Sequence, residues 1–444
     1  MVKSNKIYLD YAASVEANPS SIHSLGVDAK NKLQNARKAV ASVLGSRPEE
    51  IIFTSGGTES NNLAIQGVVW SIFEMHTYSP VGELLCSARQ PAQGISKTTK
   101  QLLPHIITTN IEHPSVLETF KLLEKRKLVE ISIVPVEENG IVDPKKIKKE
   151  IKTNTILVSV MYANNEIGTI QTIREIAKEI RHFKKMKEIN FFSGPRKKSP
   201  DHSKKLFPSF SLPLFHTDAV QAVNYLDLNV ERLGVDLLSL SGSKIEGGGK
   251  VGVLYKRKMV KLANVYGGGD QEMGLRPGTE NLAEILKFSN ALKLAQDIKE
   301  KESKRLTKLR DYFFKKLLAS QKNNFFRSSE KIPRPFKNHS FAPHIFNGDL
   351  KNRLPNNVNV TFPKIQSDLL VIELSAKGVM ASSKSACKSS NVEGSYVIKA
   401  IHPEIDREIG GLRFSMGRQT TKKDIDYTIK VLSQVLTKLK KWYN

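Results

Sequence analysis

The chain has few cysteines, no long apolar run and far fewer acidic than basic residues, and the first two deficits exclude whole classes of protein. Two cysteines in 444 residues cannot form a disulfide framework of the secreted kind. No apolar stretch reaches the roughly 20 residues of a membrane-spanning helix or forms a signal-peptide core. The composition therefore predicts a cytoplasmic protein with no membrane partner, long enough for two domains with a sizeable core.

Acidic residues are scarce, since 44 Asp and Glu stand against 69 Lys and Arg and leave a formal charge of +25. An excess of this size can indicate nucleic acid or an acidic partner. The lysines, however, are spread along predicted helices, for example at Lys145, Lys146, Lys148 and Lys149. Solvated helix faces explain them equally well, and we do not expect nucleic acid as a partner.

Two polar residues near strand ends predict a cofactor. Lys244 follows the mostly apolar run from Val235 to Leu240, and Asp218 lies in the upstream segment His216-Thr-Asp. An amine that can bond covalently to an aldehyde, together with a carboxylate that keeps a pyridine nitrogen protonated, is what pyridoxal 5'-phosphate (PLP) chemistry needs. A lysine beside glycines is common in so basic a chain, so the inference depends on the segments that accompany Lys244.

Three further segments carry suitable groups. The strand Ile51-Ile52-Phe53 runs into a glycine-rich turn containing Gly57 and Thr58, which opens a helix and could bind a phosphate. A second strand leads to Asn165 at its carboxyl end, where open α/β sheets bind ligands. His113 could lie against a planar cofactor. Taken singly, the turn is compatible with an ordinary strand-to-helix connection, and His113 with a loop histidine before a helix-starting proline.

Ordered motifs along most of the chain resemble those of cysteine desulfurases of the NifS/IscS type, within the class V aminotransferase-like, fold type I PLP enzymes. These motifs are residues 7–13, 18–24, 53–61, 164–168, 267–281, 354–360 and 412–418. The resemblance implies an α/β fold, the PLP-dependent transferase fold type I. Its large domain, with a mostly parallel seven-stranded sheet, would span residues 13–290. A smaller α+β domain, formed by residues 1–12 and 291–444, would carry a catalytic cysteine loop.

The patterning agrees with this organisation. Strands and helices alternate from Ile51 to about Tyr255, which is typical of a largely parallel sheet. A lysine-rich helix is predicted from near Leu282 to Leu318. The last helix should begin near Thr421, with Asp424 completing an approximate capping box. One of its faces is apolar and should face the core: Ile425, Ile429, Leu432, Leu436 and Leu439.

The resemblance also implies a role for individual residues, with no metal among the ligands. Lys244 resembles the lysine that bonds to PLP and later moves the substrate Cα proton, His113 the residue stacked on the ring, and Arg413 the group that grips the substrate carboxylate. Thr279 resembles a residue that reaches the phosphate from the other subunit of a homodimer. The remaining matches are Asp218 and Gln221 for the ring, Asn165 for cofactor and substrate, and Gly57, Thr58, Ser241 and Ser243 for the phosphate.

Of the two cysteines, Cys387 is the predicted sulfur acceptor. It lies in a stretch of small and polar residues typical of a mobile loop, flanked by Lys384 and Lys388, whose charges should lower its thiol pKa. The alternative, a small buried hydrophobe, fits these neighbours poorly. Cys86 lies in one of three stretches that depart from the family pattern as surface insertions, at Thr77–Thr99, Phe192–Leu214 and Asn323–Asn347.

We therefore expect an enzyme that converts L-cysteine to L-alanine and holds the sulfur as a persulfide on Cys387. The sulfur would pass to an iron-sulfur scaffold or a tRNA thiolation protein. Two alternatives stay open: a selenocysteine lyase or other class V PLP enzyme, and an inactive scaffold that binds a sulfur-transfer partner or RNA. The second is motivated by the charge and by Ser243 and Lys384, which replace a histidine and a glycine usual in the family. A short segment between Ala13 and Asn18 is a further departure.

Overall fold

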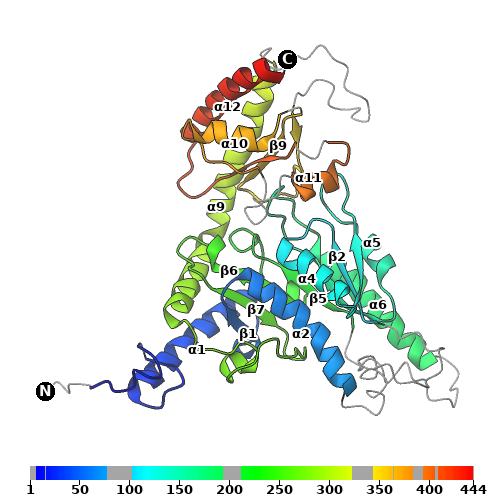
Figure 1. The fold of residues 1–444 in the computed structure, drawn as a ribbon, viewed down its shortest axis with the longest axis vertical. Coiled ribbons are helices and arrows are strands. Elements are labelled where there is room, and N and C mark those ends of the chain that lie inside the picture. The colour runs from blue at the N-terminus through cyan, green and yellow to red at the C-terminus, as the bar shows by residue number, and fades with distance from the viewer. Residues whose placement is uncertain are drawn as a thin grey trace.

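The computed structural model has a large domain built on one sheet and a small domain built on another, joined by a long helix (Figure 1). It describes residues 7–15, 17–77, 103–193, 212–322, 344–363, 365–383, 394–405 and 409–443. Most of each predicted insertion, together with Cys86, lies outside these described residues.

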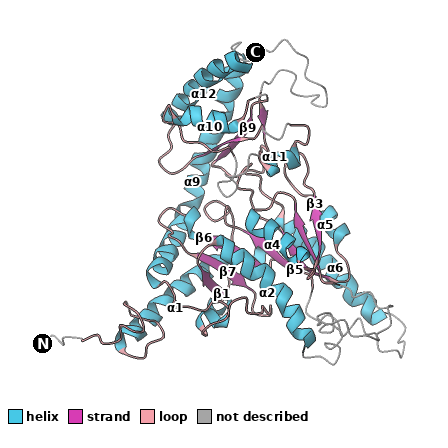
Figure 2. Cartoon of the chain, viewed as in Figure 1, coloured by secondary structure: helices cyan, strands magenta, loops and turns pink. Residues whose placement is uncertain are grey.

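The large domain is a layered α/β structure in which helices lie around a central sheet (Figure 2). Its strands are β1 (Ile51–Thr54), β2 (His105–Thr109), β3 (Glu130–Val134), β4 (Thr155–Ser159), β5 (Leu214–Asp218), β6 (Leu237–Ser241) and β7 (Gly252–Lys256). Its helices are α1 (Ser24–Leu44), α2 (Gly57–Thr77), α4 (Pro114–Lys125), α5 (Pro144–Glu150), α6 (Ile173–Ser193) and α8 (Val230–Leu233). Short helical turns are η1 (Pro48–Glu50), η3 (Gly242–Lys244) and η4 (Gln271–Gly274).

The sheet has seven strands in the order β1-β7-β6-β5-β4-β2-β3, and β7 alone runs opposite to the other six. Every residue of β1, β2, β4 and β6 is buried. Such burial is expected of near-continuous apolar strands covered by helices on both faces. The predicted fold class, with its mostly parallel seven-stranded sheet, is confirmed. Because β2, β4, β5 and β6 run the same way, their carboxyl ends lie along one edge, where such sheets bind ligands.

Helix α9 (Leu282–Lys322) connects the two domains. Its 41 residues span about 60 Å at 1.5 Å per residue. Its first half, including Phe288 and Leu292, packs in the core of the large domain, whereas Leu306 and Phe313 pack in the core of the small domain. The predicted lysine-rich helix is therefore present, and it forms one continuous rod through both cores.

The small domain contains β8 (Ile345–Phe346), β9 (Asn357–Thr361), β10 (Leu412–Ser415), α10 (Ser367–Ser375), α11 (Tyr396–Ile401) and α12 (Lys422–Tyr443). Two features bear on the predicted domain boundaries, which stay predictions. Val397 and Ile398 of α11 pack in the core of the large domain. At the other end of the chain, Asp10 accepts a hydrogen bond from Ser21 and pairs with His23 beside α1. The dark-blue N-terminal segment lies at the opposite end of the molecule from the small domain (Figure 1).

Helix α12 begins with the expected capping box. The Thr421 N–H donates to Asp424 Oδ2 over 2.8 Å, and the Asp424 N–H lies 3.4 Å from Thr421 Oγ1. Its apolar stripe packs in the core of the small domain, as predicted. Within the described residues, no helix is both long and apolar enough to cross a membrane.

We predict that Leu436→Ala lowers the free energy of unfolding of the protein by about 2–5 kcal/mol, the usual effect of truncating a buried leucine. Leu436 is 2% exposed and sits on the buried face of α12. Urea denaturation followed by circular dichroism measures the change. Lys430→Ala, an exposed position on the same helix, is the matched control and should be nearly neutral. Equal effects of the two substitutions would contradict the packing described.

Candidate active site

One cavity of about 780 Å³ opens between the two domains at the carboxyl edge of the sheet. All the predicted site residues except Thr279 and Cys387 line it, and these are Gly57, Thr58, His113, Asn165, Asp218, Gln221, Ser241, Ser243, Lys244 and Arg413. Thr279 is exposed and lies outside the lining. Cys387 lies outside the described residues.

The glycine turn at the start of α2 fits closely against the neighbouring strands. A Cβ on Gly57 would lie 2.8 Å from Val220 Cγ2, and a Cβ on Gly252 would lie 2.3 Å from Thr54 Oγ1. Both positions therefore need glycine if the turn is to stay beside β5 and β7. The turn leaves the first N–H groups of α2 at the cavity, as an anion site requires. The hydroxyl oxygens of Ser241 and Ser243, also in the cavity lining, are 2.9 Å apart.

A chain of hydrogen bonds connects the carboxylate at the end of β5 to the histidine at the start of α4. Asn61 Nδ2 donates to Asp218 Oδ2 over 2.7 Å and to Ser115 Oγ over 2.9 Å. Ser115 Oγ in turn lies 2.8 Å from His113 Nδ1. Sequence reasoning missed Asn61 and Ser115. The only available signal was the spacing of Asn61 one turn after Gly57, which places both on the same helix face.

His113 is the N-cap residue of α4, which agrees with its position before Pro114. Its Nδ1 accepts the Ser115 N–H over 3.2 Å, and this assigns the proton of the neutral ring to Nε2. Burial lowers the pKa of His113 and nearby Lys244 lowers it further, while Asp218 opposes the shift. The imidazole is therefore neutral at neutral pH.

Lys244 ends the short turn η3 that follows β6, and two contacts fix its backbone. Asn224 Nδ2 donates to the Lys244 carbonyl over 2.6 Å. A Cβ on Gly242 would lie 2.1 Å from the Gly248 carbonyl oxygen, so only glycine allows the two glycine segments to approach this closely. Lys244 itself is exposed to the cavity, and its amine is accessible to a ligand.

Arg413 reaches the cavity from β10 of the small domain. Its Nη1 donates to the Asn165 carbonyl over 2.9 Å, which connects the two predicted substrate-binding residues across the domain junction. Burial lowers the pKa of Arg413, and nearby Glu166 opposes the shift. Glu166 also accepts a short hydrogen bond from Ser395, the N-cap of α11. On the other side, Ser382 pairs with Arg413 through two backbone hydrogen bonds of 2.7 and 3.1 Å.

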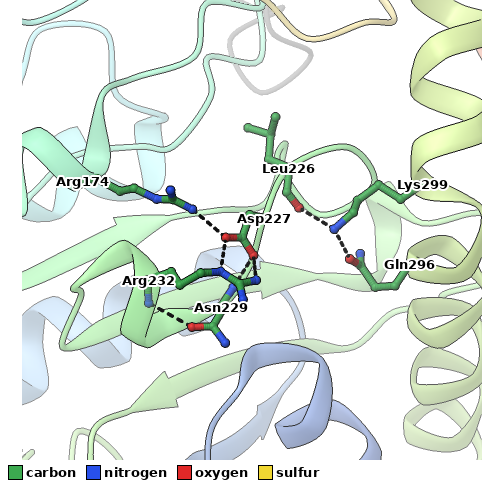
Figure 3. Close-up of polar contacts among 7 residues, drawn as sticks. All are labelled: Arg174, Leu226, Asp227, Asn229, Arg232, Gln296 and Lys299. Carbon is green, nitrogen blue, oxygen red and sulfur yellow. Dashed lines mark hydrogen bonds and ion pairs between the residues drawn. The ribbon is translucent and has the colours of Figure 1, made fainter.

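The segment of residues 219–229, which follows Asp218, is held by polar contacts near its C-terminal end (Figure 3). Asp227 accepts hydrogen bonds from Arg232 over 2.5 and 2.7 Å and from Arg174 over 2.7 Å. Lys299 of α9 lies 3.5 Å from the Leu226 carbonyl (Figure 3). The Asp227 contacts hold residues 219–229 to α6 and α8, and the Lys299 contact holds them to α9, the helix that joins the domains. These residues include the cavity residue Gln221.

The polar groups of the cavity fit PLP. The α2 turn and the two serine hydroxyls offer donors for a phosphate, and Asp218 offers a carboxylate for a pyridinium nitrogen. Lys244 offers an amine. Among the described residues, Asn61 Oδ1 and Asn165 Oδ1 are buried without a hydrogen-bond partner, which leaves two acceptors for ligand donors.

The chain is similar to several known proteins. The family model described as aminotransferase class-V matches residues 3–97, 86–188 and 211–344. The cysteine desulfurase IscS of Dictyoglomus turgidum is 37% identical over 452 residues, covering 98% of this chain and 95% of that protein. A solved structure of a NifS-like protein is 29% identical with a TM-score of 0.71, covering 95% and 91% of the two chains. The structure of SspA in complex with cysteine is 26% identical with a TM-score of 0.64, covering 90% of each chain.

A buried carboxyl group, also missed by sequence reasoning, belongs to the residue immediately before His113 in the chain. Glu112 is fully buried, and its Oε1 accepts hydrogen bonds from Thr109 Oγ1 over 2.7 Å and from the Met161 N–H over 2.9 Å. Burial raises its pKa to about 8, and the Asp218 charge adds to the shift while the two hydrogen bonds oppose it. Glu112 therefore joins the ends of β2 and β4 as a neutral acid.

We predict that Glu112→Gln removes a pH dependence of stability from the PLP-free protein. Between the ordinary pKa of 4.5 and the folded pKa of about 8, the native state holds a proton that the unfolded state has lost. The free energy of unfolding should therefore fall as pH rises through this range. Urea denaturation should show wild type losing stability relative to the variant from about pH 4.5 to 8. A constant difference across that range would contradict a protonated Glu112.

Proposed function

We infer that this chain, which belongs to the aminotransferase class-V family, is a cysteine desulfurase that converts L-cysteine to L-alanine with PLP bound between its domains. The observation that carries the inference is the convergence of Lys244, Asp218, the Gly57 turn and Arg413 on one cavity. An amine, a carboxylate, a phosphate site and a planar cation are together the groups that an amino-acid substrate and this cofactor require. The SspA structure contains cysteine, which supports L-cysteine as the substrate.

We propose a role for each of these residues from its position and from the family resemblance. The chemistry that PLP supplies when bound is withdrawal of electrons from the substrate Cα. Lys244 would hold the cofactor and then take the substrate Cα proton, and Asp218, held by Asn61, would keep the ring nitrogen protonated. Arg413 orients the substrate through its carboxylate. Neutral His113 would lie against the ring. The hydroxyls of Ser241 and Ser243 would serve the phosphate, with Ser243 standing where the family usually has a histidine.

Sulfur transfer requires a thiolate, for which we propose Cys387. Its thiolate attacks the substrate sulfur and the Cβ–S bond breaks. That bond's electron pair stays on the carbon fragment, which takes up a proton, so L-cysteine and a protein thiol give L-alanine and a protein persulfide. Cys387 is five residues from Ser382, so at most about 18 Å of extended chain separates it from a residue paired with Arg413.

We further propose that the enzyme is a cytoplasmic homodimer, with Thr279 completing the phosphate site of the opposite subunit. Its exposed position outside the cavity of its own chain supports this, and two-fold pairing is the commonest oligomeric arrangement. The persulfide sulfur would pass to the thiol of an acceptor protein, either an iron-sulfur scaffold or a tRNA thiolation protein.

We predict that the purified protein shows the visible absorption band of lysine-bound PLP and that Lys244→Ala abolishes it, because only a covalent bond to the amine produces this band. PLP can stay in the variant without the covalent bond. Absorption spectra before and after adding PLP provide the measurement, and Lys250→Ala, which replaces another lysine of the cavity lining, is the control and should keep the band. A wild-type protein that stays colourless after adding PLP would contradict the proposed cofactor.

We predict that Cys387→Ser abolishes sulfide release from L-cysteine while PLP stays bound, because a hydroxyl cannot accept the sulfur. Cys86→Ser is the control and should leave turnover nearly unchanged. Mass spectrometry after exposure to L-cysteine should find one added sulfur on the Cys387 peptide. Added sulfur on the Cys86 peptide, or normal turnover by Cys387→Ser, would overturn the proposed acceptor.

A further inference from the structure

The loop of residues 267–281 carries Thr279, and two ion pairs hold it to the rest of the large domain. Its first anchor is a buried ion pair between Arg37 of α1 and Glu272 of η4, 7% and 5% exposed. Arg37 Nη2 donates to Glu272 Oε1 over 2.6 Å and Nη1 donates to Oε2 over 2.7 Å, a two-bond fork. Neither residue lines the cavity of its own subunit.

The same pair is fixed to the edge of the sheet. Glu272 Oε2 accepts the Phe53 N–H of β1 over 2.8 Å, and Arg37 Nη1 donates to the Ile51 carbonyl over 2.6 Å. The Arg37 guanidinium also lies 4.9 Å from the centroid of the Phe53 ring. The position of the loop is thus set by α1 and by β1.

The backbone at this anchor adopts a conformation that it would not hold unaided. Glu272 and Met273 have φ values of 48° and 61°, in the left-handed region that non-glycine residues rarely occupy. Such conformations persist where surrounding contacts determine them. Met273 is 50% exposed, so the contacts that do so are those of Glu272.

A second ion pair fixes the loop nearer to Thr279. Arg276 Nε lies 3.2 Å from Glu59 Oε1 in the first turn of α2, and the Gly278 N–H donates to Gln271 Oε1 over 3.1 Å. Only residues 277–281 separate Arg276 from α9. Thr279 stands in that span, exposed to the outside of its own subunit.

We propose that Arg37 and Glu272 are positioning residues for the PLP site of the partner subunit. They fix the backbone from which Thr279 reaches the phosphate in the other chain, and so a change at Arg37 weakens cofactor binding in the partner's cavity. The proposal rests on the proposed homodimer with a shared phosphate site.

Mixed dimers with two different affinity tags test the direction of this effect. One subunit carries Lys244→Ala, so borohydride reduction attaches PLP only to Lys244 of the other subunit. Arg37→Lys keeps the charge but loses the planar fork, and it is placed either on the Lys244→Ala subunit or on the subunit that keeps Lys244. Mass spectrometry of the Lys244 peptide at increasing PLP concentration reports the cofactor affinity of that one site.

We expect the PLP affinity to fall roughly tenfold, as when a residue that orients a ligating group is lost, only with Arg37→Lys on the Lys244→Ala subunit. The opposite placement should match wild type. Lys38→Met, an exposed neighbour on α1, is the control and should change neither arrangement. An effect on the altered subunit's own site, an equal effect in both arrangements, or no effect in either would overturn the proposal.

Thr279→Ala in the same two arrangements separates this inference from the proposed dimer. If Thr279→Ala weakens only the partner's site while Arg37→Lys does not, the shared site stands and the positioning role fails. If Thr279→Ala has no effect on the partner's site, the shared phosphate site itself is wrong. Thermal melting of each dimer checks that Arg37→Lys folds, and Glu272→Gln serves as the second variant if it does not.

Discussion

The architecture of the site depends on keeping one buried carboxylate paired. Asp218 ends β5, the middle strand of the sheet, and is 5% exposed. An ionised carboxylate with no partner is costly at such a depth. Asn61 and the Val220 N–H supply its hydrogen bonds within the chain, and Asn61, one turn into α2, thereby fixes the start of that helix. The groups that satisfy Asp218 are thus the same groups that place the phosphate turn beside it.

A second constraint is the set of polar contacts at the domain junction, which accompany the apolar packing of α11 on the large domain. The Glu166 carbonyl accepts hydrogen bonds from Asn357 and Asn359 of β9 over 3.0 and 2.9 Å. Arg413 and Ser395 contact Asn165 and Glu166. Each such bond stabilises a structure by only about 1 kcal/mol, but directional bonds define one relative position of two surfaces. The cavity needs that precision, because Arg413 and Lys244 come from different domains.

The sequence predicted the features that are local in the chain. Each of three motifs marks the end of a strand or the start of a helix: a glycine turn after a strand, a lysine after another strand, and a histidine before proline. Parallel strands bring their carboxyl ends to one edge of the sheet, so these motifs were expected to lie close together. Partners such as Asn61 and Asp218, 157 positions apart, leave no periodic signal. The packing of α11 on the large domain was missed for the same reason, since the apolar residues Val397 and Ile398 would fit either core.

The Arg37–Glu272 pair shows why some buried charges are explained by geometry instead of stability. Well-packed apolar residues often replace a buried ion pair without loss of stability. Two consecutive left-handed residues, Glu272 and Met273, add a further cost of roughly 1–2 kcal/mol each. A stabilising role alone would not account for both features in one place. An apolar pair would lack the two-bond fork from Arg37, which holds Glu272 in one backbone conformation. That conformation decides the direction that residues 273–281 take away from β1.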